Sequence, residues 1–212
     1  MDRLLTLGRV GLFSAFFGIL ALAWAPAAVA NNADAEAFTQ HLVDQGVAIL
    51  RNTSDPARRA KFREFITQYA DARRTAQFTL GNYRRTASDA DVESFIKAFQ
   101  DYATAVYESR LDQYKGQTLK VVGSTDNKPG DVTVNTQVVD PNAREPLRVA
   151  FRLLGSSGNY RFVDVLVAGI WLSVEQRDQF AAFLSQHGGN VPALTAHLQT
   201  QTAEINSGAA QR

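Results

Sequence analysis

Hydrophobic positions recur at helical spacing through the first part of the chain. Apolar residues return every three or four positions between residues 34 and 51, and again from Pro56 to about Leu80. A third such segment begins after Ser88, which is a favourable N-cap residue. Its apolar face is the most regular in the chain and consists of Val92, Phe95, Phe99, Tyr102 and Val106. The pattern predicts three helices before residue 110.

The period falls to two after Gly116. Apolar and polar residues alternate over residues 132–139 and 147–153, which is typical of strands with one buried face. The segment GSSG at residues 155–158 predicts a hairpin turn into a strand at 159–167, and no Lys-Ser or Lys-Thr follows it as a phosphate loop would require. With residues 117–123 added, we expect about four antiparallel strands.

Helical spacing returns after residue 172. Ser173 and Gln176 have the spacing of a capping box, and the HGG segment at 187–189 should end that helix. A last helix is expected from Pro192 to about Ile205, with residues 207–212 as a flexible C-terminal tail. Helices, then a meander of strands, then helices predict an α+β fold with about four strands and five helices.

The first thirty residues have the features of a secretory signal peptide. Arg3 and Arg9 precede an apolar run over residues 10–24, and the AVA segment at 28–30 suits a signal peptidase cut after Ala30. A cut after Ala27 and an uncleaved anchor are the alternatives, although the run is short for a membrane span. We therefore expect residues 31–206 to form a single exported domain, located in the periplasm.

Charge and composition exclude several functions. The 22 basic and 21 acidic residues nearly balance, so the chain lacks the positive excess expected of a nucleic-acid partner. It has no cysteine, which excludes disulfides and thiolate metal sites, and its three histidines are scattered. Neither a catalytic motif nor a nucleotide-binding fingerprint is present. We expect no catalytic residues, no metal and no cofactor.

One carboxylate stands out because it interrupts an apolar strand. Asp164 lies between Val163 and Val165, where an unpaired charge would cost several kcal/mol. We expect an ion pair with Arg177, which follows the strand after a short connection. The predicted role is structural, since no second catalytic group accompanies Asp164.

Aromatic residues are numerous, with thirteen Phe and six Tyr. They could fill a core or line a cavity, and their pattern alone does not distinguish these two arrangements.

Three strings give the chain a resemblance to a known family. These are LGNYRRTAS at residues 80–88, YESRLDQYKG at 107–116, and YRFVDV at 160–165 followed by AGI at 168–170 and QRDQF at 176–180. They resemble segments of the MlaC-type, toluene-tolerance family of exported lipid carriers, in order over residues 36–205. Trp171 replaces a usual Ser and Tyr160-Arg161 a usual Trp-Lys, which is more similar to the hopanoid-associated HpnM-type branch.

The resemblance implies a soluble shuttle with an NTF2-like curved sheet, closed by helices around a hydrophobic cavity for lipid tails. It also implies partners: an inner-membrane transporter complex of MCE/ABC or RND type, and an outer-membrane lipoprotein complex that maintains outer-membrane lipid asymmetry. The cargo would be a phospholipid, with a hopanoid carried by an RND-type export system as the alternative. A lipid-free envelope adaptor and an NTF2-like enzyme remain as further alternatives.

The resemblance also assigns residues to the cavity. The predicted lining is Phe65, Tyr69, Tyr83, Phe95, Phe99, Tyr102, Val106, Val134, Val149, Phe151, Phe162, Val165 and Ile170. Arg84 and Arg85 are candidates for a headgroup contact or for docking, with a solvated basic turn as the alternative.

Overall fold

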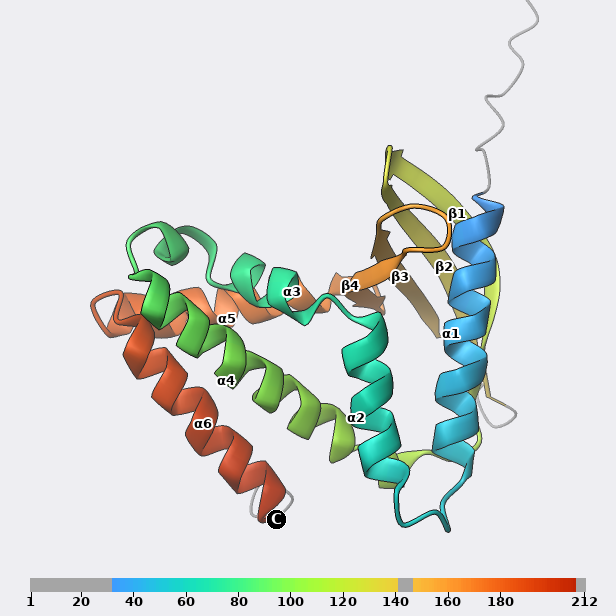
Figure 1. Cartoon of the computed structure of the whole chain (residues 1–212), viewed down its shortest axis with the longest axis horizontal. Coiled ribbons are helices and arrows are strands. Elements are labelled where there is room, and N and C mark those ends of the chain that lie inside the picture. The colour runs from blue at the N-terminus through green and yellow to red at the C-terminus, as the bar shows by residue number, and fades with distance from the viewer. Residues whose placement is uncertain (1–31, 141–146, 209–212) are drawn as a thin grey trace, which may run out of the picture.

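The computed structural model describes residues 32–140 and 147–208, which form a sheet half and a helical half (Figure 1). The helices are α1 (Ala33–Arg51), α2 (Arg58–Tyr69), α3 (Ala72–Thr79), α4 (Asp89–Glu108), α5 (Leu172–Gln186) and α6 (Val191–Asn206). The strands are β1 (Thr118–Lys128), β2 (Asp131–Val139), β3 (Arg148–Leu154), β4 (Arg161–Val167) and β5 (Ile170–Trp171). The α+β class is confirmed. The expected signal peptide and most of the expected tail lie outside the described residues.

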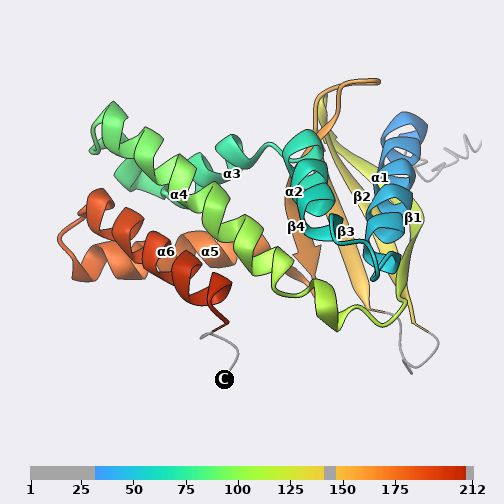
Figure 2. The same ribbon diagram turned by 60° about the horizontal axis from the view of Figure 1, so that its bottom comes forward.

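The sheet half is a meander in which each strand pairs with the next, in the order β1-β2-β3-β4-β5. Val132 and Val134 of β2 are 2% and 0% exposed and face the core, as the alternation predicts. The hairpin at residues 155–158 is also confirmed, and Gly155 has a φ of 125° where a side chain would collide with the Asn159 carbonyl. α1 lies along β1 and β2, and α2 stands beside it (Figure 2). The sheet therefore has one face covered by helices.

The helical half has its own core. α4 packs against α6, and α3 and α5 pack beside them, as Figure 2 shows. Phe95, Leu184 and Leu194 are fully buried at their centre. Ser88 caps α4 by accepting a hydrogen bond from the Asp91 backbone N–H (3.1 Å), as the sequence predicts.

Two predicted local structures are wrong. The helix expected from Pro56 to Leu80 is broken at Ala70, which is extended and forms a bridge with Phe162 of β4. The Asp71 N–H donates to the Phe162 carbonyl (2.9 Å), and the Asp71 side chain then caps α3. A strand carbonyl distant in sequence thus replaces a helical partner. The capping box at Ser173 is also absent, because its hydroxyl bonds to Asp164 instead.

Ion pairs connect the two halves at one edge. Arg63 of α2 makes two hydrogen bonds of 3.0 Å to the Glu108 carboxylate at the end of α4. Arg59 donates to the Glu108 carbonyl (2.8 Å), and both Arg58 and Arg59 pair with Asp112. α2 and α4 are therefore held together at the C-terminal end of α4.

An ion pair on the sheet, between a buried carboxylate and a partly exposed arginine, should make stability depend on pH. Arg152 holds the pKa of Asp131 below its ordinary value of 3.8, and hydrogen bonds of 3.0 and 2.7 Å join the two side chains. A depressed pKa stabilises the folded state above pH 3.8, and this contribution is lost as the pH falls through the folded pKa. We expect Asp131→Asn to cost about 2 kcal/mol at pH 7 and to reduce the loss of stability between about pH 4 and pH 2. Urea denaturation across this pH range measures both effects. If the free energies of unfolding of the wild-type protein and of Asp131→Asn changed in parallel with pH, the predicted contribution of the Asp131–Arg152 pair would be contradicted.

Candidate functional site

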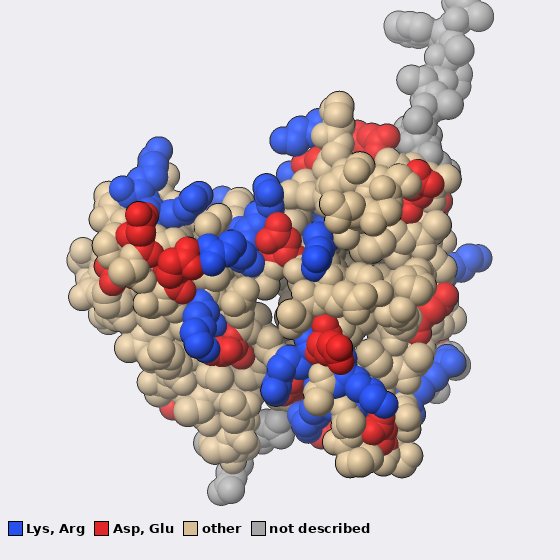
Figure 3. Space-filling model, viewed as in Figure 1, with Lys and Arg blue, Asp and Glu red and all other residues tan. Residues whose placement is uncertain are grey.

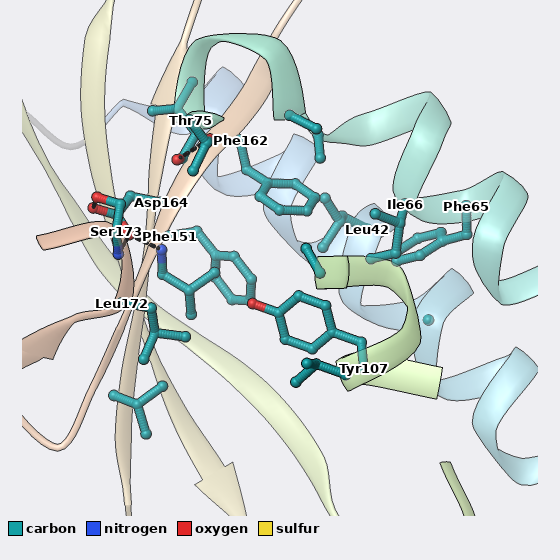
Figure 4. Close-up of a pocket in the computed structure, with 18 of the residues that line it drawn as sticks. Leu42, Phe65, Ile66, Thr75, Tyr107, Phe151, Phe162, Asp164, Leu172 and Ser173 are labelled. Atoms are coloured by element: carbon teal, nitrogen blue, oxygen red, sulfur yellow. Dashed lines mark hydrogen bonds between the residues drawn. The ribbon is translucent and has the colours of Figure 1, made fainter. Parts of the chain in front are cut away.

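A cavity of about 430 Å³ lies between the sheet half and the helical half. Its size is within the range of small-molecule sites, roughly 300–1,000 Å³. It is walled by α1, α2, α4, the sheet and the start of α5, so residues far apart in the sequence meet there (Figure 4). Figure 3 shows a hollow between the two halves, with charged residues of both signs around it.

The walls are almost entirely apolar. The α1 and α2 wall consists of Leu42, Val43, Gly46, Val47, Leu50, Phe62, Phe65 and Ile66. The α4 wall consists of Phe99, Tyr102, Ala103, Val106 and Tyr107, and the sheet adds Leu119, Phe151, Phe162, Val165 and Val167. Filling such a space with apolar ligand surface is favourable by the hydrophobic effect. The cavity therefore fits an apolar ligand.

Apart from two tyrosines of α4, the polar groups of the cavity gather on one side, where β4 meets α3 and α5. Asp164 Oδ1 accepts hydrogen bonds from the backbone N–H groups of Val165 (2.9 Å) and Ser173 (3.0 Å), while Oδ2 accepts from the Ser173 hydroxyl. The Thr75 hydroxyl donates to the Val163 carbonyl (2.7 Å). Each of these groups is satisfied within the protein, which makes this side of the cavity rigid.

The expected ion pair between Asp164 and Arg177 is not formed. Ser173 is the second residue of α5, so the Asp164 carboxylate sits at the N-terminus of that helix, where the helix dipole favours negative charge. Arg177 instead pairs with Asp178 (2.9 Å) and lies over the Phe78 ring, 5.3 Å from its centroid. Asp164 fixes strand to helix as expected, but it does so through hydrogen bonds to the helix start.

The opposite wall, formed by α4, carries the hydroxyl groups of Tyr107 and Tyr102. Figure 4 shows the Tyr107 ring projecting from α4 into the cavity, with the hydroxyl near Phe151 and Leu172 and directed toward the side that carries Asp164. Burial, and then the negative charge of Asp164, raise the pKa of Tyr107 above its ordinary value of 10.0. The hydroxyl is therefore neutral at physiological pH and available as a donor.

The structure places seven of the thirteen predicted lining residues in the cavity. They are Phe65, Phe99, Tyr102, Val106, Phe151, Phe162 and Val165. Val134, Val149 and Tyr69 pack in the core between the sheet and α1, and Phe95 packs in the helical core. Tyr83 packs against that helical core from outside, and Ile170 is 54% exposed. Apolar periodicity identifies a buried face but does not separate core from cavity.

Sequence reasoning missed the contribution of the first helix. Leu42 and Leu50 of α1 line the cavity, and their spacing was visible as an apolar helical face. What the sequence did not show is that α1 covers the sheet beside α2. Leu172, at the start of α5, was also missed, because it lies outside any periodic segment.

Arg84 and Arg85 lie on the 3₁₀ turn Gly81–Arg85, away from the cavity walls. They line a separate polar hollow together with Gln77, Asp89 and Glu93, and Arg85 donates to the Asn82 side chain (3.0 Å). Their role in headgroup contact or docking stays a prediction. Neither arginine lines the apolar cavity.

Residues 32–140 and 147–208 hold neither a cluster of metal-binding side chains nor a membrane-spanning helix. This part of the chain contains no group of three or more His, Cys, Asp or Glu side chains placed to hold a metal ion. Among the same residues, no helix combines the length and apolar composition needed to cross a bilayer.

A curved antiparallel sheet and helices that enclose an apolar cavity define a protein built to bind an apolar ligand. Residues 40–200 match the family described as "MlaC protein", and the chain belongs to this family. Its structure is similar to that of a phospholipid-binding protein from Ralstonia solanacearum, solved in complex with a phospholipid. That match has a TM-score of 0.68 and 25% sequence identity, and covers 82% of this chain and 99% of the other. The expected NTF2-like fold is thereby confirmed.

Proposed function

We propose that this protein is a phospholipid carrier that encloses acyl tails in the cavity between its two halves. The observation that carries the proposal is the apolar lining from three sides, by α1 with α2, by α4 and by the sheet. Membership of the MlaC family supports it, as does the likeness to a protein that is described as binding a phospholipid.

The energetics of transfer explain why an enclosed cavity is needed. A lipid with about thirty tail methylenes loses roughly 24 kcal/mol of hydrophobic free energy when it leaves a bilayer for water, at ~0.8 kcal/mol per methylene. A shallow groove would offset only part of this free-energy cost, because much of the tail surface would stay in water. Burial between two separately packed halves can cover most of the tail surface.

The proposal includes export and shuttling. The signal-like segment at residues 1–30 supports a periplasmic location. Because spontaneous desorption of a lipid is so unfavourable, loading and unloading should occur while the carrier is docked on membrane-bound transport complexes. The family suggests an inner-membrane transporter and an outer-membrane lipoprotein complex as these partners.

An enzymatic function has less support. Asp164 is the only acidic side chain among the described residues that line the cavity, and both of its oxygens accept hydrogen bonds from Ser173 at the start of α5. Paired acid and base groups of the kind that hydrolytic chemistry requires do not face the cavity within the described residues.

The test is to identify the cargo of the protein purified from its own host. After extraction with organic solvent, mass spectrometry should detect a glycerophospholipid in near-stoichiometric amount. A hopanoid in its place would support the alternative cargo, and a protein free of lipid that also fails to take up phospholipid from vesicles would refute the carrier function. A periplasmic protein of similar size, purified in parallel, controls for adventitious lipid.

A further inference from the structure

We propose that the Tyr107 hydroxyl donates a hydrogen bond to an acyl-ester carbonyl of the bound lipid and so favours ester lipids over lipids without that carbonyl. This inference rests on the proposed function and adds to it a specificity-determining residue. It also gives the lipid an orientation in the cavity.

The first observation is the direction of the side chain. Tyr107 belongs to the last turns of α4 and lines the cavity, and its hydroxyl points into the open space (Figure 4). The residue is 40% exposed, although it is walled by Phe151 and Leu172, so part of that exposed surface faces the cavity itself. A bound lipid would contact this surface.

The second observation is that the hydroxyl makes no hydrogen bond to another residue among those that the structure describes. Two tyrosines nearby do, since the Tyr69 hydroxyl donates to Gln45 Oε1 (2.9 Å) and the Tyr160 hydroxyl contacts Asn32 Oδ1 (3.4 Å), whereas the Tyr102 hydroxyl on the same wall as Tyr107 does not. When a lipid displaces water from Tyr107, the hydroxyl needs a new acceptor, because an unpaired polar group in an apolar site is costly. The acceptor must then come from the ligand.

The charge near Tyr107 indicates which kind of acceptor fits. Asp164 is 9% exposed, forms no ion pair with another described residue, and its negative charge acts on the Tyr107 hydroxyl more strongly than the opposing positive charge of Arg110. A phosphate placed beside Tyr107 would be repelled by this carboxylate, whereas an uncharged carbonyl would not. The same negative charge keeps the phenol protonated and therefore a donor. An ester carbonyl is the neutral acceptor that a phospholipid carries next to its tails.

The distribution of polar groups gives the orientation. The wall formed by α1 and α2 is apolar throughout, while Thr75, Asp164 and Ser173 lie on the side that the Tyr107 hydroxyl faces. The tails should therefore extend toward α1 and α2, and the glycerol should lie near Tyr107.

The experiment compares two phosphatidylcholines with identical chains, one with ester linkages and one with ether linkages. Affinities are measured with delipidated full-length mature protein by competition against a fluorescent phospholipid. We expect the wild-type protein to bind the diester roughly fivefold more tightly than the diether, the factor expected for one buried neutral hydrogen bond. Tyr107→Phe should bind both lipids about equally, with an affinity near that of the wild-type protein for the diether.

Tyr83→Phe is the matched control, because it removes a tyrosine hydroxyl outside the cavity and should leave the ester preference unchanged. Equal wild-type affinities for the two lipids would overturn the inference without any variant. So would a Tyr107→Phe protein that keeps the preference or loses affinity for both lipids equally. A wild-type protein that binds neither lipid would instead refute the proposed carrier function.

Discussion

Replacing Asp164 with alanine should lower the free energy of unfolding by about 3 kcal/mol. The change leaves the Ser173 backbone N–H and hydroxyl without their acceptor in a buried site, where Asp164 is 9% exposed and Ser173 is 7% exposed. It also removes the negative charge from the N-terminus of α5. Urea denaturation followed by circular dichroism at pH 7 measures the loss.

Two further variants separate this explanation from the ion pair that the sequence suggested. Asp164→Asn keeps one acceptor oxygen and should lose less than the alanine variant. Arg177→Ala should cost under about 1 kcal/mol, because its contacts with Asp178 and Phe78 lie at the surface. If Arg177→Ala and Asp164→Ala lowered the free energy of unfolding equally, the result would support an ion pair between the two residues and contradict the hydrogen-bonded arrangement.

The predictable parts of the fold are those that depend on local sequence. The alternation in residues 132–139 and the 3-4 spacing in residues 92–106 identified β2 and α4, since burial on one face imposes these periods. Capping by Ser88 and the turn at Gly155 were also predictable, because each depends on a few adjacent residues.

The parts that sequence reasoning missed depend on contacts distant in sequence. Ala70 leaves the helix because the Phe162 carbonyl, ninety-two positions later, accepts the Asp71 N–H. Ser173 carries a capping-box pattern, yet its hydroxyl is taken by Asp164 of a strand. In both cases a hydrogen bond to a residue distant in sequence replaces the local hydrogen bond. Neither the hydrophobic period nor a short motif predicts this replacement.

The lining of the cavity likewise depends on contacts that local sequence patterns do not reveal. The aromatic faces of α2 and α4 were identified, but Phe95 and Phe99, one turn apart on α4, are not equivalent: both pack in the helical core, and only Phe99 also lines the cavity. The difference depends on where α4 crosses from one half to the other. Along this course α4 contacts α6 and is paired with Arg63 through Glu108, and both contacts join residues distant in sequence.

Ala103→Trp should block the cavity and lower phospholipid affinity at least about tenfold, with a smaller effect on folding. Ala103 lies on the cavity wall of α4 and is only partly buried, so a large side chain can enter the cavity more easily than it could enter either core. The added ring occupies space that the tails need, and the hydrophobic gain of enclosing them falls with it. Lipid taken up from vesicles, measured per mole of protein, gives the effect.

Ala90→Trp is the matched control because Ala90 is exposed on the same helix and lies outside the cavity. This variant should load lipid as the wild-type protein does. An Ala103→Trp protein that melts normally and still carries a full complement of lipid would mean that the tails lie elsewhere. If both tryptophan variants lose lipid equally, the loss results from disturbing α4 in general. The cavity between the two halves is then not the binding site.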